Sequence, residues 1–481
     1  MRVSDYFNLG RSQPTLSFVD VDVLGDTRLF ISPRAVRLLP SQWGDECVSL
    51  IQSFFSQVLH LIHSGDDETA VGLLEQLREP NETHLGLSQG KSQGRALGVQ
   101  SARSVWRALS KSEAAKSGLL VDLEDTVLMI DGISVDVVSD MVTNIIRGPL
   151  IQYTQEASGQ YGIPLTEGVA SGPLWDAKTR SWQELFVSLP LVDGEKLLLV
   201  PKEIVRQDMD YDVDKYYRHF ILEHLRQQEL ASNSELVHVI KSGKNKGKQK
   251  VYIKDLKEKY GTGKAAVVEQ TLANPGLLQA YREELKNPSR PLTHATIADI
   301  EGTDQPDWDS LLADVINVRS GPRDAHAYEN AIESLLSALM YPALAHPRVQ
   351  HELHDGRKRV DITYSNMGHS GFFHWLAQHY SCAHIFFECK NYTYELDNPV
   401  LDQLSGRFSP SRGQVGFIVC RQLEKLDRFS ARCRDTAKDQ RGYVMVLQDS
   451  DLRELVESKK RNSLRFFDLL LIKNKFSFLV D

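Results

Sequence analysis

The sequence has few cysteines and no apolar segment long enough to cross a membrane. Its 481 residues include five cysteines, none of which forms a CxxC pair. Neither a disulfide framework nor a zinc ribbon is expected, and the thiols fit a reducing cytoplasm. Residues 1–24 lack an apolar core flanked by basic residues, so we expect no signal peptide. No apolar run approaches the roughly 18 residues of a membrane helix, so we expect a cytoplasmic protein without membrane contact.

The charge of the chain is unevenly distributed. The net charge is −8 overall, but residues 309–481 carry 23 Lys and Arg against 22 Asp and Glu, while the first 308 residues carry −9. Fifteen of those 23 basic residues are arginines, whose planar guanidinium suits phosphate. The overall acidity argues against a protein that coats DNA non-specifically, but the C-terminal part can face a polyanion.

The length of the chain predicts two or three domains. Residues 286–308 are polar, contain three prolines and show no sustained periodicity, which is typical of a linker. We therefore expect an N-terminal region of mixed α/β structure over residues 1–285 and a second domain over residues 309–481. The sequence shows no internal repeats.

The N-terminal region predicts helices and strands but no recognisable fold. We expect a recognition or regulatory role for it. The predicted helices cover residues 45–78 with a break at Gly65, 101–109 and 216–229, and the predicted strands lie within 17–40, 185–204, 236–240 and 251–253.

Two segments of this region have a structural and a functional interpretation. Residues 86–98 are rich in Gly, Ser and Gln, but Gly86–Ser92 is one residue short of a P-loop, so a flexible surface loop is favoured over a phosphate cradle. Asp136, Asp140 and Asn144 follow at one-turn spacing and could hold a cation or a polar ligand. Favourable placement of Asp136 near a helix start is the preferred explanation.

A lysine-rich segment is the strongest local charge bias in the chain. Nine lysines and only two acidic residues lie between residues 241 and 264. The lysines at its tip are candidate nucleic-acid contacts, since ammonium groups neutralise phosphates. A solvated loop tip explains the same composition equally well. The candidate residues are Lys244, Lys246, Lys248 and Lys250.

The C-terminal part alternates helices and buried strands in a readable order. We expect helix, three strands, helix, strand, helix, strand, with an additional short aromatic helix between the second and third strands. The predicted helices cover residues 325–340, 371–380, 399–408 and 423–438, and the predicted strands cover 349–353, 359–364, 385–390, 415–420 and 443–447.

The strand Ile385–Lys390 carries a carboxylate and an ammonium group at its end. Glu388 and Lys390 are two residues apart and therefore share one face of the strand. Such a pair at the end of an apolar strand is costly unless it is used. On the strand before it, residues 359–364, Asp361 lies on the face opposite to the apolar residues. Glu329 lies beside the apolar stripe of the first helix. A purely structural ion pair between Glu388 and Lys390 is the alternative.

These residues resemble the motif of the PD-(D/E)XK nuclease superfamily, which has the restriction-endonuclease-like fold. Val360-Asp361 followed by Glu388-Cys389-Lys390 matches the motif, Glu329 matches the glutamate of the preceding helix, and the following helix offers Gln403. The resemblance covers residues 310–455. It implies an αβββαβ core within an α/β, overall α+β, protein.

The resemblance also implies a chemistry for each residue. Asp361, Glu388, the backbone carbonyl of Cys389 and Glu329 would hold Mg²⁺ or Mn²⁺, which prefer hard oxygen ligands. Lys390 would orient the attacking water or stabilise developing negative charge. Gln403 would support Lys390 or the phosphate, and Arg407 would grip a phosphate.

The expected function is therefore metal-dependent hydrolysis of phosphodiester bonds, in DNA rather than RNA. Stand-alone nucleases with large additional regions suggest, by analogy, restriction or anti-phage defence in a prokaryote. A double-strand cut needs two sites, so a homodimer or a partner defence protein is compatible with this function. A catalytically silent nuclease fold that binds nucleic acid or acts as a scaffold is the alternative.

Overall fold

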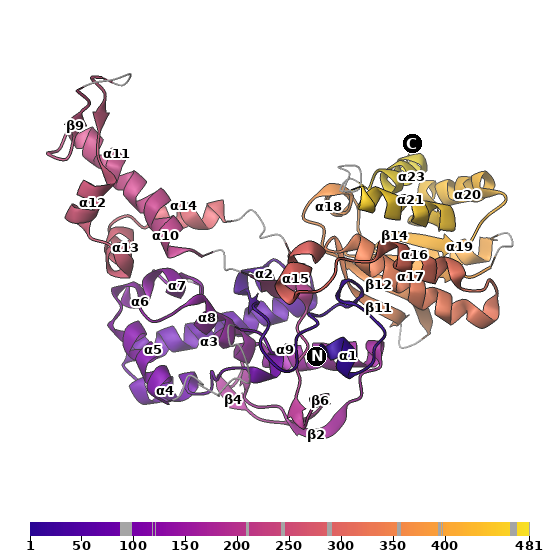
Figure 1. Ribbon diagram of the computed structural model, residues 1–481, viewed down its shortest axis with the longest axis horizontal. Coiled ribbons are helices and arrows are strands. Elements are labelled where there is room, and N and C mark those ends of the chain that lie inside the picture. Colours follow the sequence, from indigo (N-terminus) through magenta and orange to yellow (C-terminus); the bar gives the residue numbers. More distant parts are fainter. Residues whose placement is uncertain are drawn as a thin grey trace.

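The computed structural model contains two hydrophobic cores that divide the chain near residue 300 (Figure 1). One core is built almost entirely from residues 3–285, and the other from residues 312–479. The structure describes residues 1–86, 99–117, 119–120, 122–207, 211–241, 246–285, 291–353, 357–392, 396, 398–461 and 469–480. Most of the predicted loop at 86–98 and the candidate Lys244 lie outside these residues.

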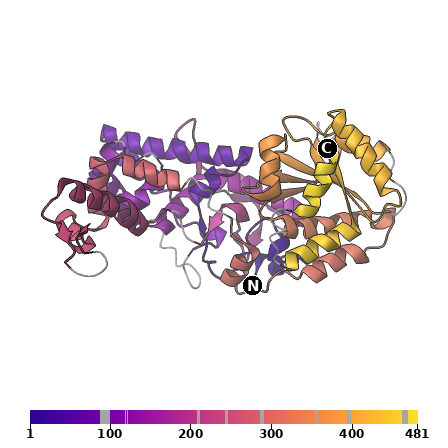
Figure 2. The ribbon, with the colours of Figure 1, turned by 90° about the horizontal axis from the view of Figure 1, so that it is seen from above.

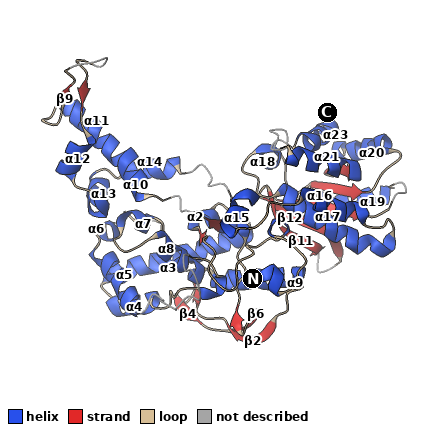
Figure 3. Ribbon diagram, viewed as in Figure 1, coloured by secondary structure: helices blue, strands red, loops and turns tan. Residues whose placement is uncertain are grey.

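The N-terminal region is a helical body with several small two-stranded sheets (Figure 3). Its helices are α1 Val3–Tyr6, η1 Gln13–Thr15, α2 Pro33–Arg37, α3 Gln42–Ser64, α4 Asp67–Leu74, η2 Asn81–Thr83, α5 Val99–Lys111, α6 Glu113–Lys116, α7 Asp125–Met129, α8 Val135–Ile145, α9 Arg147–Tyr161 and η3 Lys202–Ile204. Its strands are β1 Phe30–Ile31, β2 Thr166–Ala170, β3 Leu174–Asp176, β4 Ser181–Gln183, β5 Phe186–Leu189, β6 Leu191–Val192, β7 Glu195–Lys196 and β8 Val205–Arg206.

Helix α3 shows how local sequence sets an element of this body. The Ser41 side chain accepts a hydrogen bond from the Gly44 N–H and caps the first turn. The helix ends at Gly65, which has φ of 72°, a conformation that favours glycine. The predicted break at Gly65 is therefore confirmed. Residues at helical spacing between Ile51 and Leu61 are buried, so one face of α3 packs into the core.

Several predicted strands of this region are wrong. Within residues 17–40 the only strand is Phe30–Ile31, which pairs with β8 rather than with a neighbouring hairpin strand. Residues 197–200 are buried but lie outside any strand, and Ile253 begins a helix instead of ending a strand. Residues 197–200 are apolar because they are buried in the core and not because they pair in a sheet, whereas Tyr252 and Ile253 are exposed.

Residues 213–284 form an arm that projects away from the body (Figure 1). Two contacts anchor its base: the Lys264 ammonium donates to the carbonyls of Ile130 at 2.7 Å and Ile133 at 2.8 Å, and Arg282 is paired with the buried Asp125. Its elements are α10 Val213–Tyr216, the π-helical turn η4 Tyr217–Ile221, α11 Leu222–Ser232, β9 His238–Val239, β10 Gln249–Lys250, α12 Ile253–Tyr260, α13 Gly263–Ala273 and α14 Gly276–Glu284.

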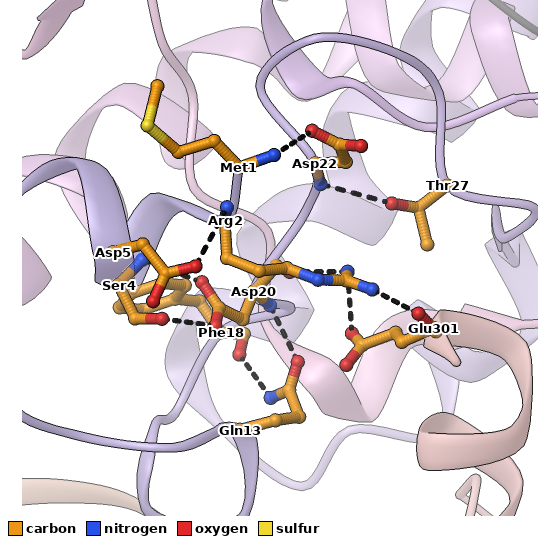
Figure 4. Close-up of polar contacts among 10 residues, drawn as sticks. All are labelled: Met1, Arg2, Ser4, Asp5, Gln13, Phe18, Asp20, Asp22, Thr27 and Glu301. Carbon is orange, nitrogen blue, oxygen red and sulfur yellow. Dashed lines mark hydrogen bonds and ion pairs between the residues drawn. The ribbon is translucent and has the colours of Figure 1, made fainter. Parts of the chain in front are cut away.

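The segment predicted as a linker contains a packed helix, α15 His294–Glu301. The buried His294 ring is hydrogen-bonded to the Ala338 carbonyl of the C-terminal domain at 2.9 Å. At the other end, Arg2 donates to the Asp20 carbonyl and to the Glu301 carbonyl (Figure 4). Helix α15 therefore bridges the two parts of the chain.

The C-terminal domain is built on one five-stranded sheet, β11-β12-β13-β14-β15. Strand β12 is antiparallel to both of its neighbours, β11 and β13, whereas β13, β14 and β15 run parallel to one another. Every residue of β14 is buried, as expected for a parallel strand that is covered on both faces. The strands are β11 Leu344–Leu353, β12 Lys358–Asn366, β13 His384–Lys390, β14 Val415–Cys420 and β15 Tyr443–Gln448.

Helices cover both faces of this sheet (Figure 2). Helices α16, α17 and α21 pack against one another on one face, and α20 and α23 pack together on the other. Phe476 of α23 holds this second layer by ring contacts with Phe372, Trp375, Tyr380 and Tyr443. The helices are α16 Trp308–Asn317, η5 Pro322–Asp324, α17 Ala325–Met340, α18 Gly371–His379, α19 Asn398–Ser405, α20 Leu426–Lys438, α21 Asp449–Lys460 and α23 Leu470–Val480.

The N-terminal region contacts helix α17 through a buried ion pair. The Arg11 guanidinium lies 2.5 Å from Glu333, whose side chain is fully buried. Ser337, one turn later, donates to the same carboxylate at 2.8 Å. Because this contact fixes the middle of α17, the N-terminal region supports the helix that carries Glu329.

We predict that Arg11→Met destabilises the chain by about 3 kcal/mol, because Glu333 is then buried without its cation. The double variant Arg11→Met/Glu333→Gln should recover most of this loss, because a neutral amide replaces the unpaired charge. Chemical denaturation of the three proteins measures both effects. Arg461→Met is the matched control, since the Arg461 side chain is 76% exposed and should matter little. Equal destabilisation by the single and double variants would contradict this account.

Candidate active site

Glu388 is the centre of a buried group of charges on strand β13. The residue is only 1% exposed, and both of its carboxylate oxygens have a cationic partner. The Lys390 ammonium lies 2.7 Å from Oε1, and the Arg407 guanidinium lies 2.5 Å from Oε2. The alternation of the strand puts Glu388 and Lys390 on one face, whereas Arg407 approaches from the loop after α19. Two cations therefore compensate one buried carboxylate.

Asp361 lies on the neighbouring strand β12, directly opposite Glu388. The pairing of Ile362 with Phe387 sets this register. Asp361 Oδ2 accepts a hydrogen bond from the Cys389 N–H at 2.8 Å, which fixes the carboxylate at the end of β13. Burial, and then the negative charge of Glu388, raise the pKa of Asp361. No described residue donates a hydrogen bond to the second oxygen, Oδ1.

Glu329 supplies a third carboxylate from helix α17. Its side chain is largely buried, and burial raises its pKa to about 7. A hydrogen bond from Gln350 opposes this shift, whereas the charges of Asp361 and Glu388 add to it. The three carboxylates therefore repel one another, an arrangement that favours binding of a cation or a proton.

Gln350 is a member of this group that the sequence does not reveal. It lies within strand β11, between the pairs Val349–Ile362 and His351–Val360, and so opposite Asp361. Its φ is 52°, which a residue with a Cβ rarely adopts in a strand. In this conformation its amide reaches Glu329 on α17. A glutamine in the middle of a strand carries no sequence pattern that predicts such a role.

A second buried network holds the end of β13. The Arg421 Nε donates to the Asn391 side chain at 2.9 Å, and its Nη1 donates to the Val315 carbonyl at 2.8 Å. The guanidinium also lies over the ring of Tyr328, with 4.2 Å between Cζ and the ring centroid. Tyr328 precedes Glu329, so this network ties α17 to the strand that carries Glu388. The sequence offers no signal for it beyond a polar residue at a strand end.

The remaining predicted residues are placed differently. Gln403 is exposed on α19 and forms no hydrogen bond with Glu388 or Lys390. Arg407 was expected to grip a phosphate but is buried, and its guanidinium contacts Glu388 instead. Burial raises the pKa of the Cys389 thiol well above its usual range, so only its backbone carbonyl suits a hard metal ion. Lys246, Lys248 and Lys250 lie on the arm, far along the chain from this site.

The site offers oxygen ligands for a divalent cation, but few of them. Within the described residues, no group of three or more His, Cys, Asp or Glu side chains is arranged to hold a metal ion. Mg²⁺ binds through one or two carboxylates and keeps several waters, so the oxygens that could hold it here are those of Asp361, Glu388 and the Cys389 carbonyl. Asp361 Oδ1 accepts no hydrogen bond from a described residue, so a metal ion would bind it without displacing a donor.

The acidic residues of helix α8 lie outside this site. Burial, and then the charge of Asp136, raise the pKa of Asp140 to about 8. Asn144 donates to the Asp140 carbonyl at 2.8 Å and to the Arg78 carbonyl, so its amide is used within the fold. Asp136 lies in the first turn of α8, where a negative charge is favourable.

Comparison with known proteins covers only part of the N-terminal region. Residues 8–212 match a family model described as a domain of unknown function (DUF8370). No curated protein and no solved structure matches the chain. The match ends immediately before the arm begins at Val213, and it does not include the candidate active site. None of the described helices combines the length and apolar character needed to cross a bilayer.

The raised pKa of Glu329 predicts a pH dependence of stability. Between about pH 4.5 and 7 the unfolded chain ionises this residue while the folded chain keeps it protonated. The contribution of Glu329 to the free energy of unfolding therefore falls as pH rises through this window. The urea midpoint of Glu329→Gln should change less between pH 5 and 7.5 than the midpoint of the wild type. Glu424→Gln, at an exposed position, should leave the wild-type slope unchanged, and an identical slope in both variants would contradict the assignment.

Because Gln350 has a left-handed conformation, we expect glycine to be more stable than alanine at this position, which is the reverse of the usual order in a strand. In an ordinary strand, a protein with glycine is less stable than the same protein with alanine by roughly 0.5–1 kcal/mol. At position 350 both substitutions remove the amide that contacts Glu329, but only alanine retains the cost of positive φ. We therefore expect Gln350→Gly to be about 1 kcal/mol more stable than Gln350→Ala. Denaturant midpoints measure the difference, and the same pair at Val349 should show the ordinary order.

Proposed function

We propose that this chain is a metal-dependent nuclease whose C-terminal domain has a restriction-endonuclease-like core. The observation that carries the proposal is the convergence of Asp361, Glu388 and Lys390 on adjacent strands at one end of the central sheet. The order of helix α17, three antiparallel strands, and a parallel extension of the sheet supports the fold assignment. Asp361, Glu388 and Lys390, which match the motif in the sequence, lie close together in the structure.

Each residue of the site would have a separate role in phosphodiester hydrolysis. When bound, Mg²⁺ would lower the pKa of the attacking water and neutralise charge on the phosphoryl group. Asp361 and Glu388 would hold the cation, and the Cys389 N–H keeps Asp361 oriented toward it. The Lys390 ammonium would stabilise negative charge as water attacks phosphorus and the bond to the leaving oxygen breaks. The Arg407 guanidinium holds the buried Glu388 carboxylate in position.

A second candidate function follows from the same contacts. Lys390 and Arg407 together occupy both oxygens of Glu388, so this carboxylate is neutralised without any metal. A nuclease fold with such internal compensation can bind nucleic acid without cutting it. This silent form predicts binding under every condition, and no change of thermal stability on adding a divalent cation.

DNA remains the proposed substrate rather than RNA, and restriction or anti-phage defence the proposed setting. Both proposals rest on analogy with stand-alone nucleases that carry large additional regions. A double-strand cut would require two copies of the site, either in a homodimer or with a partner defence protein.

Cleavage of supercoiled plasmid, single-stranded DNA and RNA in Mg²⁺ or Mn²⁺ tests the proposal. We expect Asp361→Ala and Lys390→Ala to lower the rate by roughly 100-fold or more, because each removes a charge that acts at the reacting phosphate. The matched controls Asp435→Ala and Lys438→Ala remove the same charges at exposed positions of α20 and should cut at the wild-type rate. Activity that persists in Asp361→Ala and Lys390→Ala would refute the site.

Thermal stability separates the two candidate functions without an activity assay. Mn²⁺ that binds the folded chain should raise its melting temperature, because binding to the native state adds to its stability. The shift should vanish in Asp361→Ala and persist in Asp435→Ala. No shift in the wild type, together with binding of nucleic acid, would favour the silent form.

A further inference from the structure

We infer that the tip of the arm is a phosphate-binding surface that holds nucleic acid away from the candidate active site. This surface, the arm tip, comprises the described residues 238–241 and 246–253, which include strands β9 and β10 and the start of α12. In Figure 1 it lies at the opposite end of the molecule from the C-terminal sheet. The inference goes beyond the proposed function and does not depend on it, because binding needs no cleavage.

The arm tip is a folded surface. Gln249 pairs with Val239 and Lys250 pairs with His238 across the hairpin. The Ile240 N–H donates to the Lys248 carbonyl at 3.0 Å, which extends the hairpin beyond the named strands. The structure therefore holds the backbone of these lysines in one arrangement.

The ammonium groups of the arm tip are available for a ligand. Lys241, Lys246, Lys248 and Lys250 are all exposed, and none forms an ion pair with a described residue. By contrast, three other lysines of the arm are held within the fold by acidic side chains or backbone carbonyls, namely Lys215, Lys259 and Lys264. The unpaired cations are thus concentrated at the tip.

The acidic residues nearby do not cancel this charge. Asp255 is bound to the His238 ring at 3.0 Å, and Glu258 is the one other acid between residues 241 and 264. The chain as a whole carries −8, so a polyanion is repelled by much of the molecule. Charge complementarity therefore directs a polyanion to the arm tip.

The spacing of the tip lysines suits a nucleic-acid backbone. Lys248 and Lys250 are two residues apart on an extended segment, so they share a face and are separated by roughly 6.6 Å. Successive phosphates of one DNA strand rise by about 3.4 Å along the helix axis and also turn around it, so the distance between two neighbouring phosphates is comparable with the spacing of these lysines. The Lys250 ammonium also lies 4.8 Å from the centroid of the exposed Tyr252 ring, which restricts its position.

The chemistry of the tip favours nucleic acid over a lipid surface. Only three large apolar side chains are exposed among the described residues of the tip: Val239, Tyr252 and Ile253. A single exposed aromatic ring offers little base stacking, so we infer contact with the sugar-phosphate backbone without sequence preference.

Binding of labelled 40-base-pair DNA to the full-length chain in EDTA tests the inference by fluorescence anisotropy. The triple variant Lys246→Ala/Lys248→Ala/Lys250→Ala should weaken binding at least tenfold at 100 mM salt. It should also reduce the slope of log K against log salt by up to about 2.7, or about 0.9 for each lost phosphate contact. The same series with single-stranded DNA and with RNA should show the same dependence on these lysines.

A second triple variant controls for net charge. Lys178→Ala/Lys438→Ala/Lys473→Ala removes three exposed lysines outside the arm and should retain wild-type affinity and slope. Equal weakening by both triples, or no binding of any nucleic acid by the wild type, would overturn the inference. Binding to phosphatidylserine vesicles but not to nucleic acid would overturn it in favour of a membrane surface.

Asp361→Ala distinguishes this inference from the proposed nuclease. In EDTA, DNA binding by this variant should keep the same dependence on the tip lysines. Loss of the lysine dependence with intact cleavage would refute the arm tip alone, whereas intact binding without cleavage in any metal would refute the nuclease alone.

Discussion

The buried carboxylate of Glu388 is the constraint on which the rest of the C-terminal domain depends. A carboxylate that is 1% exposed cannot remain ionised without close positive charge, and the fold supplies Lys390 and Arg407. Lys390 lies on the same strand as Glu388, so no further element is needed to bring it to the site. Arg407 requires helix α19 to deliver a loop back to the end of β13. The crossover between the parallel strands β13 and β14 is therefore part of the site as well as part of the sheet.

Helix α17 is held from both sides because it carries a member of this group. The Arg421 network fixes its start through Tyr328, and the N-terminal region fixes its middle through the pair of Arg11 and Glu333. Glu329 lies between these two contacts. Any rearrangement of the N-terminal region that breaks the pair with Glu333 leaves a buried charge on α17, one turn from Glu329. The physical coupling between the two parts of the chain thus passes through a single helix.

The sequence predicts the five strands of the C-terminal sheet and helices α17 to α20 because their signals are strong and independent, but it does not predict α16, α21 and α23. Strands β13, β14 and β15 are apolar runs between helices, and the alternation around Asp361 identifies β12. The site residues that were predicted by strand or helix position do meet, whereas Gln403, inferred only by resemblance, does not join them. Gln350 depends on a positive φ within a strand, and Arg421 on distant carbonyls, which no local pattern encodes. In the N-terminal region, apolar segments such as residues 197–200 are buried by helices, and periodicity alone cannot distinguish that burial from pairing in a sheet.

The charges of the site suggest why Glu329 is kept close to its point of ionisation. If Asp361, Glu388, Lys390 and Arg407 are counted at their formal charges, the group is neutral while Glu329 is protonated. In the proposed reaction, a divalent cation and a phosphodiester anion together add one positive charge. Ionisation of Glu329, whose pKa is about 7, then restores the balance within the buried group. A carboxylate with an ordinary pKa would instead add an uncompensated negative charge before any ligand arrives. The hydrogen bond from Gln350 acts on this same equilibrium, since it favours the ionised form.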